Sequence, residues 1–368
     1  MNKNNITHLI KPGALIALTT SLVIGCVSQQ PKSTEQQANP LVPASKFDLS
    51  HWKINVPVDL DNDGKIDEID VKKIQTYSHP DFFYLDDKGY MVFTSPNKAL
   101  TSANSTNTRS EFRQMLRGAN TKIKTKSPKN NFALAVHPLS DRFGSIGGKM
   151  EATLKVDHVA LRATDPSKNA AYSVVVGQIH AGKDQALIDT KKLGYGWGNE
   201  PLKIYYKKWP GHKTGSVFWN YERNLPKTDP NRTDIAYPVW GNTWENPNEP
   251  GNAGIALGEE FSYTVNVYKN VMHLTFSTAG KNDVSYSINL GNNVDAYGNV
   301  DEKDHPHGYA ADWHYFKAGA YNQCSTKNAK GIWYPGCLGT GDWATDKQNG
   351  DYAQVSFSKL VLSPASPQ

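Results

Sequence analysis

A short segment near residue 110 alternates charged and uncharged side chains. It reads Thr-Arg-Ser-Glu-Phe-Arg-Gln over residues 108–114. Alternate residues of a β-strand point to the same face, so Arg109, Glu111 and Arg113 would share one side. A carboxylate between two guanidinium groups can pair with both, and the guanidinium groups can still offer paired donors to a sugar carboxylate. The alternative is a solvated row of ion pairs on an outer sheet face.

Two further segments place candidate proton-transfer groups on predicted strands. The apolar run that begins at residue 174 ends with Gln178 and His180 on one face. In residues 315–323 one face carries alternate positions, which are Tyr315, Lys317, Gly319, Tyr321 and Gln323. The glycine removes side-chain bulk, so we expect a ligand to approach the backbone there. Taken singly, these groups could equally be satisfied polar residues of a core or of an exposed strand.

Together the three segments supply what β-elimination from a uronic acid requires. The C5 proton of such a sugar becomes acidic only when hydrogen bonds and positive charge neutralise the adjacent carboxylate. A base must then remove this proton, and an acid must protonate the departing O4. Arginine and glutamine suit the neutralisation, whereas histidine and tyrosine suit the proton transfers. A glycoside hydrolase would need two carboxylates flanking the bond, and these segments contain one, Glu111.

Apolar and polar residues alternate over many short segments, which indicates β-strands rather than helices. The predicted strands span residues 52–56, 90–94, 108–114, 131–136, 149–156, 171–179, 202–206, 216–221, 261–268, 272–277, 315–323 and 352–362. This pattern predicts an all-β sandwich or jelly roll. Residues 181–200 and 223–258 are expected to be long loops that partly close a substrate cleft. The second contains Trp240 and Trp244, which could stack on sugar rings.

The N-terminal part of the chain predicts export. Residues 1–25 combine a basic start with a short apolar run, as in a secretory signal peptide. Cys26 follows a small residue and looks like the lipidated cysteine of a bacterial lipobox; an ordinary signal peptide with a bystander cysteine is the alternative. Residues 26–45 are rich in Gln, Ser, Pro and Ala and are predicted to be a disordered tether. Residues 46–368 are predicted to form one catalytic domain.

Net charge and cysteine content agree with an exported protein that meets an acidic substrate. The net charge of +5 falls to +3 once the two lysines of the signal peptide are removed, which is too mild to indicate a nucleic-acid partner. Cys324 and Cys337 are the two cysteines beyond Cys26, and an oxidising compartment favours a disulfide between them. Two free cysteines are the alternative.

A possible calcium loop occupies residues 59–70. Its spacing follows the EF-hand pattern, with glycine at loop position 6. The predicted ligands are Asp59, Asp61, Asp63, Lys65 (through its carbonyl position), Asp67 and Asp70. The last is Asp rather than Glu, which shortens its reach and should reduce affinity. The ion would have a structural role; the alternative is an acidic surface turn without an ion.

The three chemical segments resemble, in order, the signature strands of polysaccharide lyase family 7. The matching sequences are Arg-Ser-Glu-Phe-Arg at residues 109–113, Gln-Ile-His at 178–180 and Tyr-Phe-Lys-Ala-Gly-Ala-Tyr-Asn-Gln at 315–323. The similarity extends from about residue 48 to the final strand. It implies an all-β, concanavalin A-like jelly-roll β-sandwich with a concave substrate-binding sheet. The implied activity is alginate lyase, which cleaves the 1,4-glycosidic bond and leaves 4,5-unsaturated uronate ends.

The resemblance also implies roles for individual residues. Tyr321 would be the catalytic acid and a candidate base, and His180 the base for one sugar epimer. Arg109 and Gln178 would neutralise the substrate carboxylate. The sugar subsites would be shaped by Arg113, Glu111, Lys317 and Gln323. An isoleucine between the Gln and the His tends to accompany cleavage of guluronate or mixed blocks, and the family needs no metal for catalysis.

Two other classes of function are compatible with parts of the sequence. A non-catalytic, lectin-like module could hold an acidic polysaccharide with the same basic and aromatic groups, and a structural surface lipoprotein would make the three motifs coincidental. The expected partners are alginate or oligoalginate and, through Cys26, a membrane. We expect a monomer that is lipid-anchored at the bacterial outer membrane, on its periplasmic or cell-surface side, or secreted.

Overall fold

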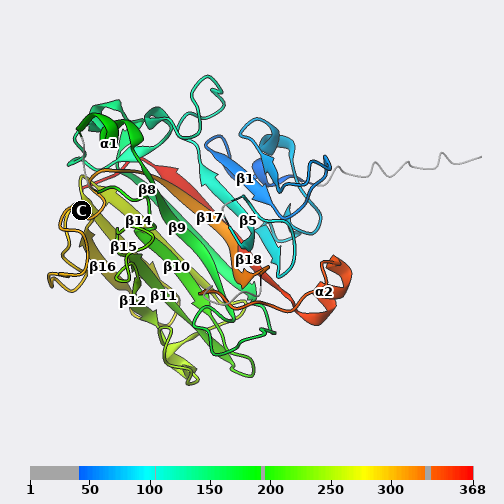
Figure 1. Cartoon of the computed structure of the whole chain (residues 1–368). Helices are drawn as coiled ribbons and strands as arrows, with labels where there is room; N and C mark the ends of the chain where they lie inside the picture. Colours follow the sequence, from blue (N-terminus) through cyan, green and yellow to red (C-terminus); the bar gives the residue numbers. More distant parts are fainter. Residues whose placement is uncertain (1–40, 104, 192–194, 328–332, 368) are drawn as a thin grey trace, which may run out of the picture. The chain divides into compact units, whose positions relative to one another are not determined.

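The structure, a computed structural model, describes residues 41–103, 105–191, 195–327 and 333–367. Over these residues the chain folds into two β-sheets packed face to face (Figure 1), which confirms the predicted β-sandwich. The predicted signal peptide, Cys26 and residues up to 40 lie outside the described part. Residues 43–45, assigned above to the tether, instead form a 3₁₀ turn, η1, with Pro43 buried. Within the described ranges, no helix has the length and apolar character needed to cross a membrane.

The larger sheet has eleven strands among the described residues and carries the three chemical segments at its centre. Its main path, in spatial order, is β12 (Asp234–Trp240), β11 (Thr214–Glu222), β10 (Leu202–Lys207), β9 (Ser173–Lys183), β17 (Asp312–Ser325), β5 (Asn107–Gln114), β1 (Trp52–Val56) and β2 (Asp67–Ile69). Three short strands lie off this path, namely β13 (Ile255–Ala256) beside β11, β6 (Phe132–Ala133) beside β17, and β7 (Ser145–Ile146) beside β6.

The smaller sheet has seven antiparallel strands among the described residues. Their order is β16 (Val284–Asn289), β15 (Val271–Ser277), β14 (Glu260–Tyr268), β8 (Gly148–His158), β18 (Tyr352–Ser363), β4 (Met91–Pro96) and β3 (Phe83–Leu85). Helices are few and short. They are α1 (Gln185–Lys191), α2 (Trp343–Asn349) and the 3₁₀ turns η1 (Pro43–Ser45), η2 (Lys73–Thr76), η3 (Pro128–Asn130), η4 (Ser140–Arg142) and η5 (Gly251–Ala253).

The hydrophobic core lies between the two sheets and leaves the other face of the larger sheet for chemistry. Phe112 of β5 meets Phe93 of β4 across the sandwich, with ring centres 4.9 Å apart. Each such fully buried ring stabilises the fold by roughly 2–3 kcal/mol. Tyr263 of β14 reaches the larger sheet and donates a hydrogen bond of 3.2 Å to the carbonyl of Val176. Because successive residues of a strand alternate between faces, the polar residues between these core positions point outward.

Most predicted strands are confirmed, whereas the two predicted long loops contain secondary structure. Residues 181–200 include the end of β9 and helix α1, and residues 223–258 include β12, η5 and β13. Trp240 and Trp244 are both buried, so the expectation that they offer open stacking surfaces is wrong. The strand predicted over residues 131–136 is reduced to the two residues of β6.

Candidate active site

Strands β9, β17 and β5 lie side by side at the centre of the larger sheet and bring the predicted residues onto one face. Residues directly opposite each other in a sheet point to the same side. The register pairs Tyr321 with Arg109, Lys317 with Arg113 and Gln178, and Tyr315 with His180. Three segments that are far apart in the sequence therefore form one polar surface, as the sequence analysis expected.

Gly319 in β17 has a different role from the one predicted. A Cβ atom at this position would lie 2.5 Å from the carbonyl oxygen of Ser110 and 2.9 Å from the Cα atom of Glu111. Its φ of +140° is also one that other residues rarely adopt. Strand β5 fills the space beside Gly319, so the glycine allows close strand packing.

The carboxylate of Glu111 connects three of the predicted site residues. It accepts hydrogen bonds from the Lys317 ammonium and the Gln178 amide, and Nη1 of Arg109 donates to it at 3.0 Å. Burial by itself would raise the pKa of Glu111, but Lys317 and Arg109 lower that pKa below its ordinary value. Glu111 is therefore an ionised, buried group that fixes the positions of its three partners.

A cavity of about 370 Å³ opens on this polar surface. Its lining residues are Lys53, Asn55, Glu68, Ser102, Ser105, Arg109, Arg113, Thr125, Lys126, Gln178, His180, Glu200, Trp313, Tyr315, Lys317 and Tyr321. Two predicted subsite residues are not among them. Glu111 lies beneath the cavity, and the Gln323 amide donates to the backbone carbonyl of Tyr321 at 3.1 Å. Both contact residues that line the cavity and do not line it themselves.

His180 is held against the aromatic ring of Tyr315. The two rings are stacked with centres 5.3 Å apart and an interplanar angle of 10°. Nδ1 of His180 lies 2.6 Å from the carbonyl oxygen of Ala181. Burial lowers the pKa of His180 to about 4, and the nearby charge of Lys317 acts in the same direction. The ring is therefore neutral near pH 7, which is the form that can accept a proton.

The cationic residues of the site have distinct environments. Burial lowers the pKa of Lys317 to about 8, although Glu111 opposes the shift. The guanidinium group of Arg113 lies 3.9 Å from the Tyr315 ring centre and donates to Oδ1 of Asn131 at 2.7 Å. Arg113 therefore anchors the segment around Asn131, whereas Lys317 and Arg109 are placed to meet an anionic ligand.

Several residues that line the cavity were not predicted from the sequence, among them Trp313 and Glu200, whereas Tyr315 was already expected on this face. Trp313 lies two residues before Tyr315 on β17, so the same alternation could have identified it. Glu200 lies in the segment between α1 and β10, with Oε1 3.0 Å from Nε2 of His180. No local pattern marks Glu200, because tertiary folding brings its segment beside His180.

The polar surface is covered on one side and continues on the other. On β10 and β11, Tyr205 and Phe218 are buried beneath Trp244, whose ring centre lies 4.6 and 4.5 Å from theirs. In the opposite direction, a second cavity of about 740 Å³ shares Asn55, Glu68 and Ser102 with the first and extends to the loop of residues 60–67. The residues that line the two cavities therefore reach from the loop of residues 60–67 to the centre of the larger sheet and include none of β10 or β11.

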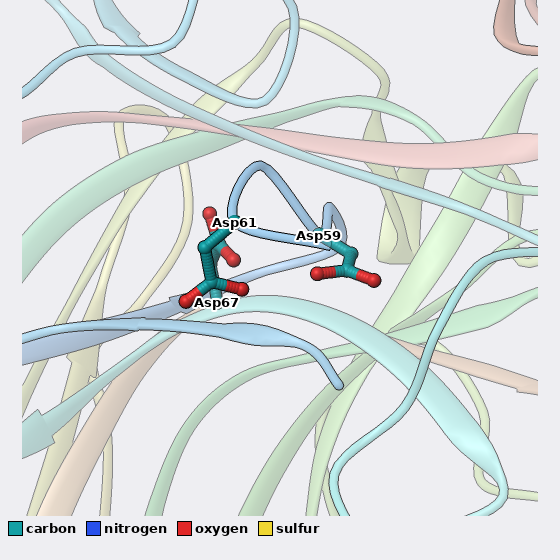
Figure 2. A group of neighbouring side chains, drawn as sticks. All are labelled: Asp59, Asp61 and Asp67. Carbon is teal, nitrogen blue, oxygen red and sulfur yellow. The ribbon is translucent and has the colours of Figure 1, made fainter. Parts of the chain in front are cut away.

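The predicted calcium loop brings three of its six expected ligands together. Asp59, Asp61 and Asp67 each place a carboxylate oxygen within 4.8 Å of the others (Figure 2). Asp63 instead pairs with Lys65 at 2.8 Å, and Asp70 accepts hydrogen bonds of 3.0 Å from the backbone of Lys72 and Lys73 at η2. The three carboxylates fit the oxygen preference of Ca²⁺. The other three predicted ligands, Asp63, Lys65 and Asp70, are not part of this group, although the backbone N–H of Asp63 donates to Asp59 at 2.9 Å and to Asp61 at 3.3 Å.

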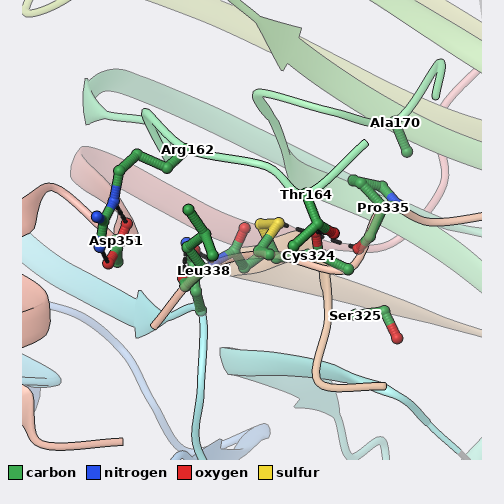
Figure 3. The surroundings of a disulfide bond; sticks show 12 residues. Arg162, Thr164, Ala170, Cys324, Ser325, Pro335, Leu338 and Asp351 are labelled. Atoms are coloured by element: carbon green, nitrogen blue, oxygen red, sulfur yellow. Dashed lines mark hydrogen bonds and ion pairs between the residues drawn. A yellow bond between two sulfur atoms is a disulfide. The ribbon is translucent and has the colours of Figure 1, made fainter. Parts of the chain in front are cut away.

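The disulfide between Cys324 and Cys337 is confirmed, and the free-cysteine alternative is excluded (Figure 3). It joins the end of β17, three residues after Tyr321, to the segment that begins at Trp333. The backbone N–H of Thr164 donates to the carbonyl of Gly336 at 2.8 Å and so secures this segment further. Trp333 in turn lies against Trp244, with ring centres 5.4 Å apart. The disulfide thus supports the cover over the closed side of the groove.

The arrangement can neutralise a carboxylate and transfer protons beside it. Arg109, Gln178 and Lys317 provide donors and positive charge, while His180 and Tyr321 provide a neutral imidazole and a phenol on the same wall. These are the groups that elimination from a uronic acid requires.

Comparison with known proteins agrees with this chemistry. Residues 47–364 match the model of a family described as alginate lyase. An alginate lyase from Klebsiella pneumoniae is 38% identical over 304 residues, which cover 80% of this chain and 88% of the relative. The crystal structure of an alginate lyase from Klebsiella pneumoniae has a TM-score of 0.68 at 33% identity and covers 89% of this chain and 100% of its own. The exolytic family 7 alginate lyase AlyA5 from Zobellia galactanivorans also has a TM-score of 0.68, at 34% identity, covering 89% and 99%.

Proposed function

The chain belongs to the alginate lyases of polysaccharide lyase family 7, and we propose that Tyr321, His180, Arg109 and Gln178 carry out its cleavage of alginate. The protein is thus a polysaccharide lyase with alginate as substrate. The observation that supports the residue assignment is the register of β9, β17 and β5, which points all four side chains into one cavity.

The proposed reaction is a β-elimination at one uronate residue. Arg109, Gln178 and Lys317 bind the C6 carboxylate and stabilise the charge that develops on it. A base removes the C5 proton, and the electron pair of that bond forms the C4–C5 double bond. The C4–O4 bond breaks, and the Tyr321 hydroxyl gives its proton to O4. The products are a new reducing end and a 4,5-unsaturated uronate at the new non-reducing end.

We assign the two bases to different sugar epimers. Guluronate and mannuronate differ in configuration at C5, so they present the C5 proton on opposite faces of the ring. His180, neutral near pH 7, serves guluronate, and Tyr321 serves as base and acid for mannuronate. Ile179 between Gln178 and His180 supports a preference for guluronate or mixed blocks through the family resemblance.

We further propose that the enzyme acts on chain ends. The groove ends where Trp244 covers Tyr205 and Phe218, so a polymer entering from the loop of residues 60–67 would meet a wall beyond the catalytic residues. The similar AlyA5 is described as exolytic, which supports the same mode of action.

One assay tests both the reaction and its position along the polymer. Incubation with alginate should produce the ultraviolet absorbance of the conjugated double bond, and sizing of the products should show small fragments from the first minutes. A binding module would retain alginate without any rise in absorbance.

Calcium and export complete the proposal. We propose that Asp59, Asp61 and Asp67 hold a structural Ca²⁺, with no part in catalysis; their mutual proximity supports this role. We also propose that Cys26 carries a lipid anchor at the outer membrane, on the strength of the N-terminal sequence. Mass spectrometry of the mature N-terminus tests the anchor: an unmodified or absent Cys26 would indicate an ordinary secreted form.

A further inference from the structure

Both ring nitrogens of His180 lie against oxygen atoms. Nδ1 lies 2.6 Å from the carbonyl oxygen of Ala181, and Nε2 lies 3.0 Å from Oε1 of Glu200. A carbonyl oxygen accepts hydrogen bonds and cannot donate one, so the Ala181 contact places a proton on Nδ1. Nε2 then carries the lone pair that can accept a proton, and the Glu200 carboxylate lies at ion-pair distance from it. The negative charge of this carboxylate favours the imidazolium that exists after proton transfer.

The backbone holds Glu200 firmly in this position. The carbonyl of the preceding residue, Asn199, accepts from the N–H of Ala181 at 2.9 Å, next to His180. The Glu200 carbonyl accepts from the N–H of Glu222 at 3.2 Å, and the Glu200 N–H donates to Oε2 of Glu222 at 3.1 Å. Glu200 is thus clamped between β9 and β11, and its location does not depend on a flexible side chain alone.

The Glu200 carboxylate is ionised. Burial alone would raise its pKa, but a hydrogen bond from Glu222 and the charge of Lys203 lower that pKa below its ordinary value. Lys203 Nζ lies 3.8 Å from Oε2, which leaves Oε1 facing His180. Burial raises the pKa of Glu222, the partner in this hydrogen bond, to about 7.

The other groups around His180 mostly oppose its protonation. Burial, Lys317 of β17 and Arg109 of β5 lower its pKa, whereas the Ala181 carbonyl and Glu222 of β11 act the other way. Tyr315 stacks on the ring. These groups keep the imidazole neutral before the reaction, but they also make the imidazolium costly. A carboxylate already in place beside Nε2 would offset that cost in the transition state.

We propose that Glu200 is a positioning residue for His180: its carboxylate orients the ring and stabilises the imidazolium that forms when Nε2 takes the C5 proton. The C5–H bond breaks as the Nε2–H bond forms, and the charge of the Glu200 carboxylate, 3.0 Å from Nε2, stabilises the imidazolium. The electron pair of the C5–H bond forms the C4–C5 double bond, and the C4–O4 bond breaks as O4 takes a proton from Tyr321. The inference rests on the proposed role of His180 as base.

The test begins with Glu200→Gln, which keeps the size of the side chain and removes its charge. On short guluronate oligosaccharides kcat should fall roughly tenfold or more, because the base is weaker. KM should stay the same or fall, since the groove loses a negative charge that faces an anionic substrate. The acid limb of the kcat profile should move to lower pH. A rise in KM with kcat unchanged would overturn the proposal, because it would mean a simple substrate contact.

Three further variants make the result specific. Glu200→Asp keeps the charge and should retain more kcat than Glu200→Gln. Glu68→Gln removes a charge from the opposite wall, where Glu68 pairs with Lys53 at 2.6 Å, and should leave the acid limb in place. In the His180→Ala background, Glu200→Gln should cause no further loss, because its effect passes through His180. An equal loss in both backgrounds would overturn the role of Glu200, whereas normal guluronate cleavage by His180→Ala would overturn the base assignment itself.

Discussion

The guanidinium carbon of Arg109 lies 4.0 Å from the centre of the Tyr321 ring. The same guanidinium group donates to Glu111 at 3.0 Å and to the hydroxyl of Ser105 at 2.8 Å, so its position is fixed from both sides. A positive charge held over the ring favours the negative charge that Tyr321 carries once its proton has moved to O4. Arg109 is therefore placed for both of its proposed roles, which are to bind the substrate carboxylate and to assist Tyr321.

Removal of one oxygen atom from this pair should stop the reaction. Tyr321→Phe should lower kcat by about a hundredfold or more, because the proton donor for O4 is lost while the ring keeps its packing. Initial rates of absorbance increase measure the loss, and thermal unfolding checks the fold. Tyr315→Phe is the matched control on the same strand and should retain far more activity. Near-normal turnover by a folded Tyr321→Phe protein would exclude Tyr321 as the acid.

Loss of His180 should affect the cleavage of guluronate blocks and of mannuronate blocks to different extents. His180→Ala should reduce cleavage of polyguluronate much more than that of polymannuronate, because Tyr321 can still serve as base on the mannuronate face. The two rates are compared on purified block substrates at equal uronate concentration. Equal losses on both substrates would contradict the division of labour between the two bases.

The pH dependence of substrate binding should report on Lys317. Its folded-state pKa of about 8 lies below the ordinary value for lysine, so Lys317 is charged near pH 7 and loses its charge as the pH rises through 8. KM should therefore rise by about tenfold between neutral and alkaline pH, as one charged hydrogen bond to the substrate carboxylate is lost. In Lys317→Arg this rise in KM at alkaline pH should be absent, because arginine stays charged.

A second lysine provides the control for this measurement. Burial also lowers the pKa of Lys207 on β10, to about 7. Its ammonium group donates to the carbonyl of Ala171 at 3.1 Å, beneath the covered part of the sheet and outside the cavity. The rise in KM at alkaline pH should therefore persist in Lys207→Met. If the rise in KM disappears in Lys207→Met and persists in Lys317→Arg, the titrating group is Lys207, and the assignment to Lys317 is wrong.

Removal of calcium should affect stability and leave the chemistry intact. A chelator should lower the melting temperature, because Asp59, Asp61 and Asp67 would repel one another without the ion. The initial rate at low temperature should barely change. Asp61→Asn should lose the chelator-dependent shift. If neither the wild type nor this variant responds to the chelator, and elemental analysis finds no calcium, the loop is an acidic turn without an ion.

Measurements of viscosity can distinguish cleavage at the ends of the polymer from cleavage at internal bonds. An enzyme that accepts chain ends at a groove closed beside Trp244 should release small products early while the viscosity of alginate falls slowly. Viscosity and absorbance are followed in the same sample. The absorbance gives the number of bonds cleaved, against which the fall in viscosity is compared. A collapse of viscosity at low absorbance, with large fragments, would show internal cleavage and an open groove.

The sequence alone determined the sheet fold and the main chemical groups. Alternation with a period of two marks both the strands and the faces of their residues, so Arg109, Gln178, His180, Lys317 and Tyr321 could be placed on polar faces. The disulfide was also predictable, because the predicted lipidation of Cys26 leaves two of the three cysteines, and the oxidising compartment predicted from residues 1–25 favours their pairing. These features depend on local spacing or on counting, which the sequence contains in full.

Tertiary structure decided which polar residues line the cavity and which support those residues from beneath. Glu111 and Gln323 belong to the same motifs as the cavity residues, yet Glu111 lies beneath the cavity, and Gln323 binds the backbone. Gly319 serves strand packing, and Trp244 is buried against Tyr205 and Phe218 instead of offering a stacking surface. Glu200 reaches His180 because β9 and β11 clamp its backbone. Such contacts join residues that are distant in the chain, so they follow from strand register and loop packing, which no local pattern specifies.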